Sequence, residues 1–250
     1  MKIVYDLETV PRAPTDEEMA EILDHPKFAV ISDEDIHMQA LAVSSKYKQP
    51  ATIQKHYDAT VSKLSDARID IMMHRQEGAK QEWYEKNAFC APLLKIVAFS
   101  LVGIQGDNIV DQLSASGEDC IQEFPKLFSS LCNHGGVKHG VPIMVGYNST
   151  KFDMPVLKMN LVKNNLALTP RLSAKSWDNA DIRYSLCGTK GTLKQVVQET
   201  FGAEYDEDEN GSSVLGWYFK GDFDKIENYC NKDTLLTAKL YLRLCKVQSG

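Results

Sequence analysis

The sequence has no apolar run that approaches the about 20 residues a membrane-spanning helix needs. Its first apolar run, in "MKIVYDLET", already meets an acid at Asp6, so we expect no secretory signal peptide. The six cysteines form no Cys-x-x-Cys pair, which argues against a disulfide framework and for reduced thiols. These absences predict a cytoplasmic protein with no membrane partner.

An excess of positive charge is also missing. The chain carries 28 basic and 34 acidic residues, a net charge of −6, which argues against a protein that holds nucleic acid by a general basic surface. The charge is uneven, because residues 151–194 hold eight basic and three acidic residues, and residues 195–228 hold two and nine. The basic segment could follow a phosphate backbone, or it could be a solvated helix face.

The remaining pattern is that of a folded α/β protein, with 43% apolar residues in a chain of 250. Apolar runs predict strands at residues 2–9, 94–103, 108–113 and 142–147. Helical periodicity predicts helices at residues 117–133, 152–165, 192–202 and 222–244. Strands that come first, with helices that follow and flank them, predict a three-layer α/β domain spanning residues 1–250.

One segment departs from this order. Residues 12–89 lie between two predicted core strands, whereas ordinary connections take about 4 to 6 residues. The segment contains an acidic helical stretch at 16–24 and a long helical pattern at 53–87. We therefore predict a mainly helical insertion after the first strand.

Four carboxylates are placed where a metal site could form. Asp6 and Glu8 lie on the same face of the first strand, about 7 Å apart along the chain, because side chains alternate in a strand. Asp153 comes where a strand gives way to a helix, and Asp233 falls on the apolar side of its helix, one turn after Tyr229. Each acid alone is more often a cap or a surface group. Together they form an all-oxygen set suited to Mg²⁺ or Mn²⁺.

These residues carry a family resemblance. "YDLET", "VGYNSTKFDMPVL" and "YCNKD" resemble the three motifs of the DEDD 3′-to-5′ exonucleases of the ribonuclease H-like fold, in the subgroup whose third motif is Tyr-x-x-x-Asp. The stretch from "GSSVLGWYFK" onwards is similar to predicted stand-alone exonucleases related to the proofreading domain of family B DNA polymerases, many of them encoded by bacteria and phages. The resemblance covers residues 1–11 and 90–246, and Tyr147 stands where many relatives have His. It implies a central mixed sheet flanked by helices.

The resemblance also implies a mechanism with two divalent ions, Mg²⁺ or Mn²⁺. Asp6 would bridge both ions, Glu8 and Asp233 would complete the site that binds the attacking water, and Asp153 would serve the second ion. Tyr229 would orient the water, because a phenol of ordinary pKa near 10 is a poor base at neutral pH. The expected reaction releases nucleoside 5′-monophosphates from the 3′ end of single-stranded DNA.

Five further residues are candidates for substrate contact. Leu7 and Thr9 flank the acids, at positions that touch the terminal nucleotide in the family, and simple strand packing is the alternative. Asn148 and Phe152 could meet the scissile nucleotide, or serve a turn and the core. Lys190 stands near a helix start, where a phosphate could be bound. We expect Asp178 and Asp181 to be structural, or to support the site residues without direct contact with the ions.

Two alternatives to this reaction stay open. An exoribonuclease would use the same acids and tyrosine. A catalytically silent nucleic-acid-binding or polymerase-accessory subunit would have no need of them. The insertion adds a further question, because residues 46–95 carry nine basic and six acidic residues whereas residues 1–42 carry three and ten. It could grip the strand, bind a replication or repair partner, or only cover a sheet edge.

Overall fold

The computed structural model describes residues 1–134, 142–167, 179–188, 190–202 and 210–248. The chain divides into two compact units, one made of Met1–Arg12 with Ala88–Gly250 and the other of Ala13–Asn87. No helix among the described residues is both long and apolar enough to cross a membrane.

The first unit is built on a five-stranded sheet with the order β3-β2-β1-β4-β5. The strands are β1 (Lys2–Pro11), β2 (Leu94–Gln105), β3 (Asn108–Ser116), β4 (Ile143–Gly146) and β5 (Asn179–Asp181). β1 is antiparallel to β2, β2 is antiparallel to β3, and the pairs β1/β4 and β4/β5 are parallel. The sheet is therefore mixed, as expected for a ribonuclease H-like domain, and β1 is its central strand.

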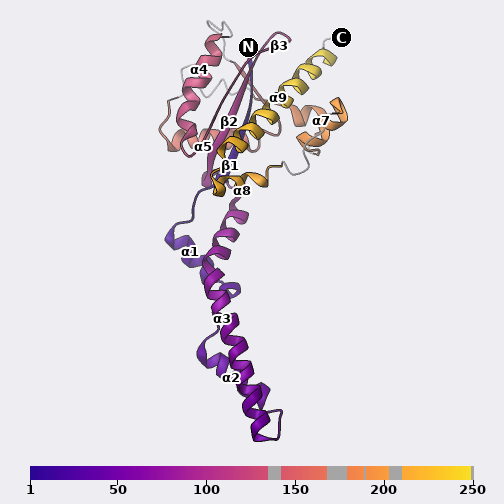
Figure 1. The fold of residues 1–250 in the computed structure, drawn as a ribbon. Coiled ribbons are helices and arrows are strands. Elements are labelled where there is room, and N and C mark those ends of the chain that lie inside the picture. Colours follow the sequence, from indigo (N-terminus) through magenta and orange to yellow (C-terminus); the bar gives the residue numbers. More distant parts are fainter. Residues whose placement is uncertain (135–141, 168–178, 189, 203–209, 249–250) are drawn as a thin grey trace. The chain divides into compact units, whose positions relative to one another are not determined.

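Helices cover both faces of this sheet (Figure 1). They are α4 (Phe124–His134), α5 (Asp153–Lys163), α6 (Ile182–Cys187), α7 (Leu193–Phe201), α8 (Ser213–Lys220) and α9 (Phe223–Gln248), with 3-10 turns η2 (Ala91–Leu93) and η3 (Cys120–Glu123). On one face, Ile3, Tyr5 and Leu7 of β1 pack in a cluster with residues of α4 and α5. On the other, Val4 and Val10 pack with residues of α6 to α9.

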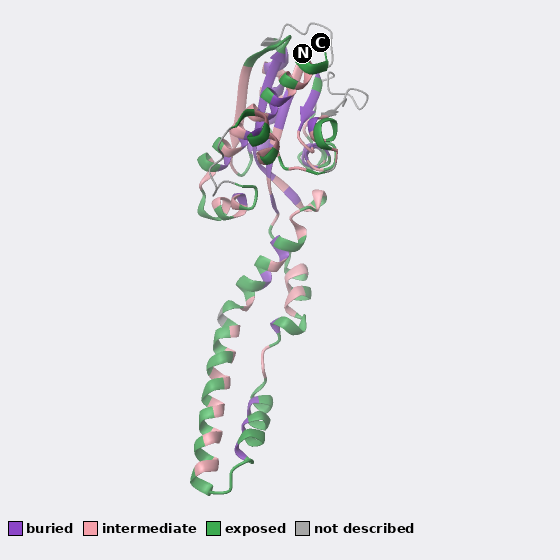
Figure 2. Ribbon diagram, turned by 90° about the vertical axis from the view of Figure 1, so that its right-hand side faces the viewer, coloured by how far each residue is buried: buried purple, intermediate pink, exposed green. Residues whose placement is uncertain are grey.

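This alternation makes β1 a largely covered strand. Ile3, Val4 and Tyr5 are each exposed by no more than 1%, and Figure 2 shows the central strands buried along most of their length. A strand buried on both faces has no solvent-facing position for an ordinary carboxylate. Asp6 and Glu8 on this strand therefore need a specific environment.

The predicted elements of the first unit are largely confirmed. The single helix predicted for residues 117–133 is divided into η3 and α4, and Pro125 is the second residue of α4, directly after the junction. Thr192 is the N-cap of α7, and its side chain accepts a hydrogen bond from the backbone N–H of Gln195 in a capping box. Three elements of this unit were not predicted from the sequence, namely β5, α6 and α8. They contain three, six and eight residues, and short elements depend on tertiary packing more than on their own periodicity. The 12-residue helix α2 (Asp33–Ser44) of the second unit was not predicted either.

The second unit is helical. It contains α1 (Asp16–Leu23), η1 (Pro26–Phe28), α2 (Asp33–Ser44) and the 38-residue α3 (Pro50–Asn87). α2 packs along α3 in the opposite direction, since His37 is hydrogen-bonded to Tyr57 at 2.6 Å and Arg68 is paired with Asp33. Thr15 and Ser32 form capping boxes that begin α1 and α2.

Candidate active site

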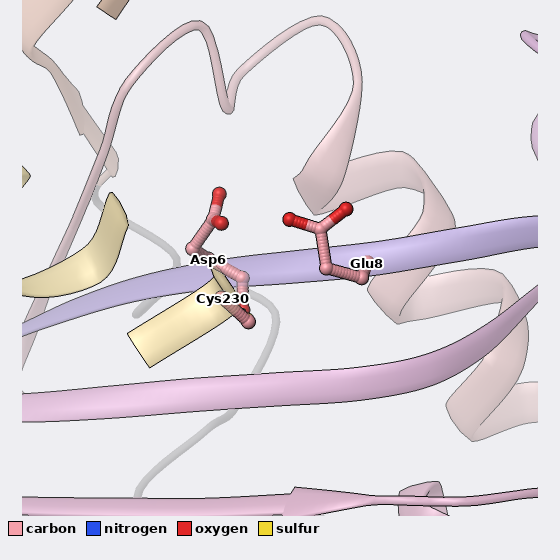
Figure 3. A group of neighbouring side chains, drawn as sticks. All are labelled: Asp6, Glu8 and Cys230. Atoms are coloured by element: carbon pink, nitrogen blue, oxygen red, sulfur yellow. The ribbon is translucent and has the colours of Figure 1, made fainter. Parts of the chain in front are cut away.

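The first part of the site lies on β1. The carboxylates of Asp6 and Glu8 project from the same side of the strand (Figure 3), which is the side that Val4 and Val10 turn towards α9 and its neighbours. Glu8 is 8% exposed and Asp6 is half-buried. A bulge between Glu8 and Thr9 shifts the register with β2 at this point. The strand thus presents two neighbouring acids beneath the helical layer.

The helix α9 supplies the second part. Tyr229 and Asp233 are one turn apart, so their side chains reach the same region, and Asp233 is 9% exposed. Between them, Cys230 is fully buried, and its thiol donates a hydrogen bond of 3.5 Å to the backbone oxygen of Asp6. The Cys230 Sγ and carboxylate oxygens of Asp6 and Glu8 lie within 4.8 Å of one another. α9 therefore contacts β1 directly at the acidic pair.

A polar network fixes the position of α9 on the sheet. Glu227 accepts hydrogen bonds from the hydroxyls of Ser114 and Ser116 on β3, both at 2.6 Å. Gln112 of β3 donates to the backbone oxygen of Asn231 at 3.1 Å. Glu227 and Asn231 are also one helical turn apart, so the network holds one side of α9 against β3. This fixes the rotation of the helix that carries Tyr229 and Asp233.

The third part is the turn between β4 and α5. Asn148 has φ of 61°, a left-handed conformation that Asn tolerates better than most residues. Its backbone N–H donates to Asp181 Oδ1 at 3.0 Å, and that of Thr150 donates to Asp181 Oδ2 at 3.3 Å. Asp181 also caps α6. It thus has the structural role expected of it, holding the turn that leads to Asp153, the first residue of α5; Asp178 lies outside the described residues.

These parts enclose a cavity of about 370 Å³. Its lining comes from β1, the β4–α5 turn, α6, the start of α7 and α9: Asp6, Glu8, Tyr147, Asn148, Arg183, Gly191, Thr192, Leu193, Tyr229 and Asp233. Asp153 is 7% exposed and is not part of this lining, but its charge acts on Asp6 and Glu8. The structure therefore brings the carboxylates of all three sequence motifs into one region.

Crowding of like charges dominates the electrostatics of this region. Burial raises the pKa of Asp6 well above its usual range, and the charges of Asp153 and Asp233 raise it further. Burial likewise raises the pKa of Glu8, with added contributions from Asp6, Asp233 and Asp153. Burial raises the pKa of Asp153 to about 7, and Asp181 adds to the effect. An ionised cluster of this kind is unstable without a source of positive charge.

The donor set fits a divalent cation. Within the described part of the chain, Asp6, Glu8 and Asp153 form no salt bridge with a Lys or Arg. Carboxylate oxygens are the preferred ligands of Mg²⁺ and Mn²⁺. Burial raises the pKa of the Cys230 thiol, so this group stays protonated and is a poor ligand for such hard ions. The oxygens of the acidic residues are the candidate ligands.

Two tyrosines border the cavity in different ways. Burial raises the pKa of Tyr229, and the charges of Asp233, Glu8 and Asp6 raise it further, so its hydroxyl remains a hydrogen-bond donor. The hydroxyl of Tyr147 donates to the backbone oxygen of Gly191 at 3.1 Å. Tyr147 thus ties the β4–α5 turn to the residues that precede α7.

The remaining residues selected from the sequence lie elsewhere. Leu7 is 4% exposed and packs in the cluster on the opposite face of the sheet. Phe152 precedes α5, packs against the same cluster and contacts Phe89 edge-on, with ring centroids 5.9 Å apart. Thr9 and Lys190 do not line the cavity, although Lys190 is exposed and directly precedes the lining residue Gly191. Of these candidates for substrate contact, only Asn148 lines the cavity.

The structure also adds residues that the sequence did not single out. Arg183 lines the cavity from α6, and Cys230 joins α9 to β1. Arg183 follows Asp181 by two residues within the basic segment 151–194, which was the one signal available for it. Cys230 carried no signal, because a buried cysteine on a helix is ordinarily a packing residue.

A mixed sheet with helices on both faces, and a carboxylate cluster beside its central strand, define an α/β protein of the ribonuclease H-like class with a candidate acidic site. A family model described as a predicted 3′-5′ exonuclease related to the exonuclease domain of PolB matches residues 88–250. The chain belongs to this family of predicted exonucleases. No curated protein matches the chain. The matched residues include Asp153, Tyr229 and Asp233, whereas Asp6 and Glu8 lie before them.

Replacement of one acid should stabilise the metal-free protein. We expect Asp233→Asn to raise the melting temperature in EDTA, because it removes one charge from the cluster while keeping the side-chain volume. Each kcal/mol of relieved repulsion corresponds to about 2–4 °C in a protein of this size. The gain should be smaller near about pH 6 than near about pH 8, since the raised pKa values mean that the wild-type carboxylates already bind protons at the lower pH.

Differential scanning fluorimetry would measure both effects. Glu199→Gln is a matched control, because it removes one charge from an exposed position on α7. A fall in melting temperature for Asp233→Asn in EDTA would contradict the proposed repulsion.

Proposed function

We propose that the protein is a metal-dependent 3′-5′ exonuclease that releases nucleoside 5′-monophosphates from the 3′ end of single-stranded DNA. The observation that carries the proposal is the single cavity lined by Asp6, Glu8, Tyr229 and Asp233, with the charge of Asp153 acting on it. Membership of an exonuclease family supports the reaction class. The described helices and sheet leave one side of the acidic cluster open to this cavity, where a strand end would enter.

Asp6, Glu8, Asp153 and Asp233 are the residues we propose to hold two Mg²⁺ or Mn²⁺ ions. When bound, the ions would supply the positive charge that activates the attacking water and stabilises the leaving 3′ oxygen. Asp6 would be the ligand shared by both ions, because the charges of Asp153 and Asp233 both act on its carboxyl group and raise its pKa. Glu8 and Asp233 would lie on the side of the attacking water, and Asp153 on the other.

Tyr229 has a separate role in this proposal. Its raised pKa keeps the hydroxyl protonated at neutral pH, so it does not accept the proton of the attacking water. A protonated hydroxyl beside Asp233 and Glu8 can instead hold the water in line with the phosphorus atom. The network of Glu227 and Asn231 would fix this geometry by fixing the rotation of α9.

Arg183 is proposed to bind the phosphodiester. It is the basic residue in a lining whose other charged groups are the carboxylates of Asp6, Glu8 and Asp233. A guanidinium can contact two phosphate oxygens at once, and it would help to offset the repulsion between the anionic strand and these acids.

The proposal also concerns the alternative functions, the cellular setting and the helical unit. RNA is the alternative substrate, because the same four acids and Tyr229 would serve either sugar. A non-catalytic accessory subunit would leave the acidic cavity without a purpose. A cytoplasmic setting fits the reduced thiols inferred from the sequence. We further propose that the helical unit Ala13–Asn87 binds substrate or a replication or repair partner, because basic residues are enriched at 46–95 and acidic ones at 1–42.

The acids themselves provide the primary test. Asp6→Asn, Glu8→Gln, Asp153→Asn and Asp233→Asn should each remove nearly all cleavage of a 5′-labelled single strand, and excess EDTA should do the same to the wild type. Denaturing gels would show the loss of the mononucleotide ladder, with matched DNA and RNA oligonucleotides to decide the sugar. Glu199→Gln should retain wild-type activity. Near wild-type rates in two of the four variants would overturn the metal assignment.

Tyr229→Phe isolates the role of the hydroxyl. Loss of a group that aligns the nucleophile commonly costs about a hundredfold in rate, so kcat should fall by about that factor. Affinity for Mn²⁺, measured by calorimetry, should barely change, because the carboxylates remain. A collapse of Mn²⁺ affinity in this variant would show that Tyr229 supports the ligands instead.

Arg183→Met should weaken substrate binding more than turnover. We expect KM to rise about tenfold with a smaller change in kcat. The slope of the logarithm of the binding constant against the logarithm of the salt concentration should decrease in magnitude by about 0.7, as for the loss of one phosphate contact on a single strand. Arg183→Lys, which keeps the charge, should recover part of the affinity. An unchanged salt slope in Arg183→Met would exclude a phosphate contact.

A further inference from the structure

A second cavity of about 510 Å³ lies between the end of α7 and the C-terminal half of α9. It is lined by Phe201, Lys239, Leu242, Arg243, Lys246 and Val247, and we call it the α7–α9 groove. Its α9 residues recur at intervals of three and four, so they share one face of the helix. None of them belongs to the acidic site.

The groove combines positive charge with apolar surface. Lys239, Arg243 and Lys246 are exposed, and none of them forms an ion pair with a carboxylate of the described residues. Phe201 is 37% exposed and Val247 is 76% exposed. The part of α9 that lines the groove differs in charge from the chain as a whole, since the net charge is −6 but residues 234–250 contain no Asp or Glu.

Phe201 is positioned as a stacking surface. It is the last residue of α7, and the helix ends at Gly202, whose φ of 63° turns the chain away after it. The guanidinium of Arg243 lies 5.6 Å from the centre of the Phe201 ring, within the range of a cation–π contact. An aromatic ring beside cations is the combination that single-stranded nucleic acids bind, with bases on the ring and phosphates on the cations.

The same helix pair connects the groove to the acidic cavity. Thr192 and Leu193, at the start of α7, line the cavity, whereas Phe201, at its end, lines the groove. α7 is packed firmly on α9, because Val197 is buried in one cluster with Ala238 and Leu240. The nine residues of α7 span about 13 Å, which corresponds to about four nucleotides of a stacked strand.

We propose that the α7–α9 groove is a second binding site for single-stranded nucleic acid, which holds the substrate several nucleotides upstream of the 3′ end. The proposal rests on the proposed exonuclease function for the identity of the strand. A short substrate fills only the acidic cavity, and a longer one also reaches Phe201, Arg243 and Lys246. The groove therefore sets a preference for longer strands without taking part in the reaction.

Binding without cleavage gives the first test. In EDTA, the dissociation constant of a fluorescently labelled single strand of about twelve nucleotides should rise about tenfold in the double variant Arg243→Ala/Lys246→Ala. The slope of the logarithm of the binding constant against the logarithm of the salt concentration should decrease in magnitude by about 1.4, because two phosphate contacts are lost. Phe201→Ala should weaken binding by a similar factor with an unchanged salt slope, since it removes stacking and no charge.

The control is Lys126→Ala/Lys220→Ala, which makes the same change in net charge at exposed positions on α4 and α8. It should bind like the wild type. If both double variants lost the same affinity for the single strand, the effect would come from net charge alone, and the groove would not be a specific binding site. A poly-glutamate peptide that competes as well as an unlabelled oligonucleotide would also overturn its assignment to nucleic acid.

Turnover separates this proposal from the proposed function. With Mg²⁺, Arg243→Ala/Lys246→Ala should lower kcat/KM about tenfold on the long strand and leave it unchanged on the shortest oligonucleotide that the wild type cleaves. Equal losses of kcat/KM on the long and the short substrate would contradict the proposal that the groove binds the strand. If the wild type cleaves neither substrate, the exonuclease proposal fails, and the binding experiment in EDTA still decides whether the groove holds nucleic acid.

Discussion

Repulsion among buried carboxylates is the constraint on which this structure depends. Asp6, Glu8, Asp153 and Asp233 come from three elements that are far apart in the sequence, and the folded chain holds them together. Burial raises the pKa of the first three, and the charges of the other acids raise the pKa of Asp6 and Glu8 further. Packing of the surrounding core must offset this cost. A bound cation would offset this repulsion, and the electrostatic cost in the free protein is therefore the physical argument for the proposed metal dependence.

The helix α9 organises most of the rest. One side of it is fixed to β3 by Glu227 and Asn231, Cys230 contacts β1 beneath it, and Tyr229 and Asp233 project into the acidic cavity. Its C-terminal half carries the cations of the α7–α9 groove. Because one rigid helix carries both regions, the spacing between the reacting end of a strand and its upstream contacts would be set by the fold and not by a flexible loop.

The family match begins at residue 88 and so leaves out β1, which lies before the inserted helical unit in the sequence. β1 is the central strand of the sheet and carries Asp6 and Glu8, but the 75 residues of the unit Ala13–Asn87 separate it from β2 in the sequence. β1 and β2 nevertheless pair over their whole length, from Lys2 with Ile104 to Pro11 with Leu94. An insertion at a strand end leaves the ladder intact, because the two chain ends that it joins lie side by side in the sheet.

Local sequence patterns were enough to predict the α/β class, four of the five strands, the longer helices of the first unit and the four candidate acids with Tyr229. These features depend on local periodicity, on the alternation that places Asp6 beside Glu8, and on motif spacing. Which residues share a cavity followed only from the packing of the folded chain. It added Arg183 and Cys230, put Leu7 into the opposite core, and brought Phe201 to the cations of α9. These outcomes depend on how the helices pack on the sheet, which is set by contacts between distant segments and leaves no periodic signal in the chain.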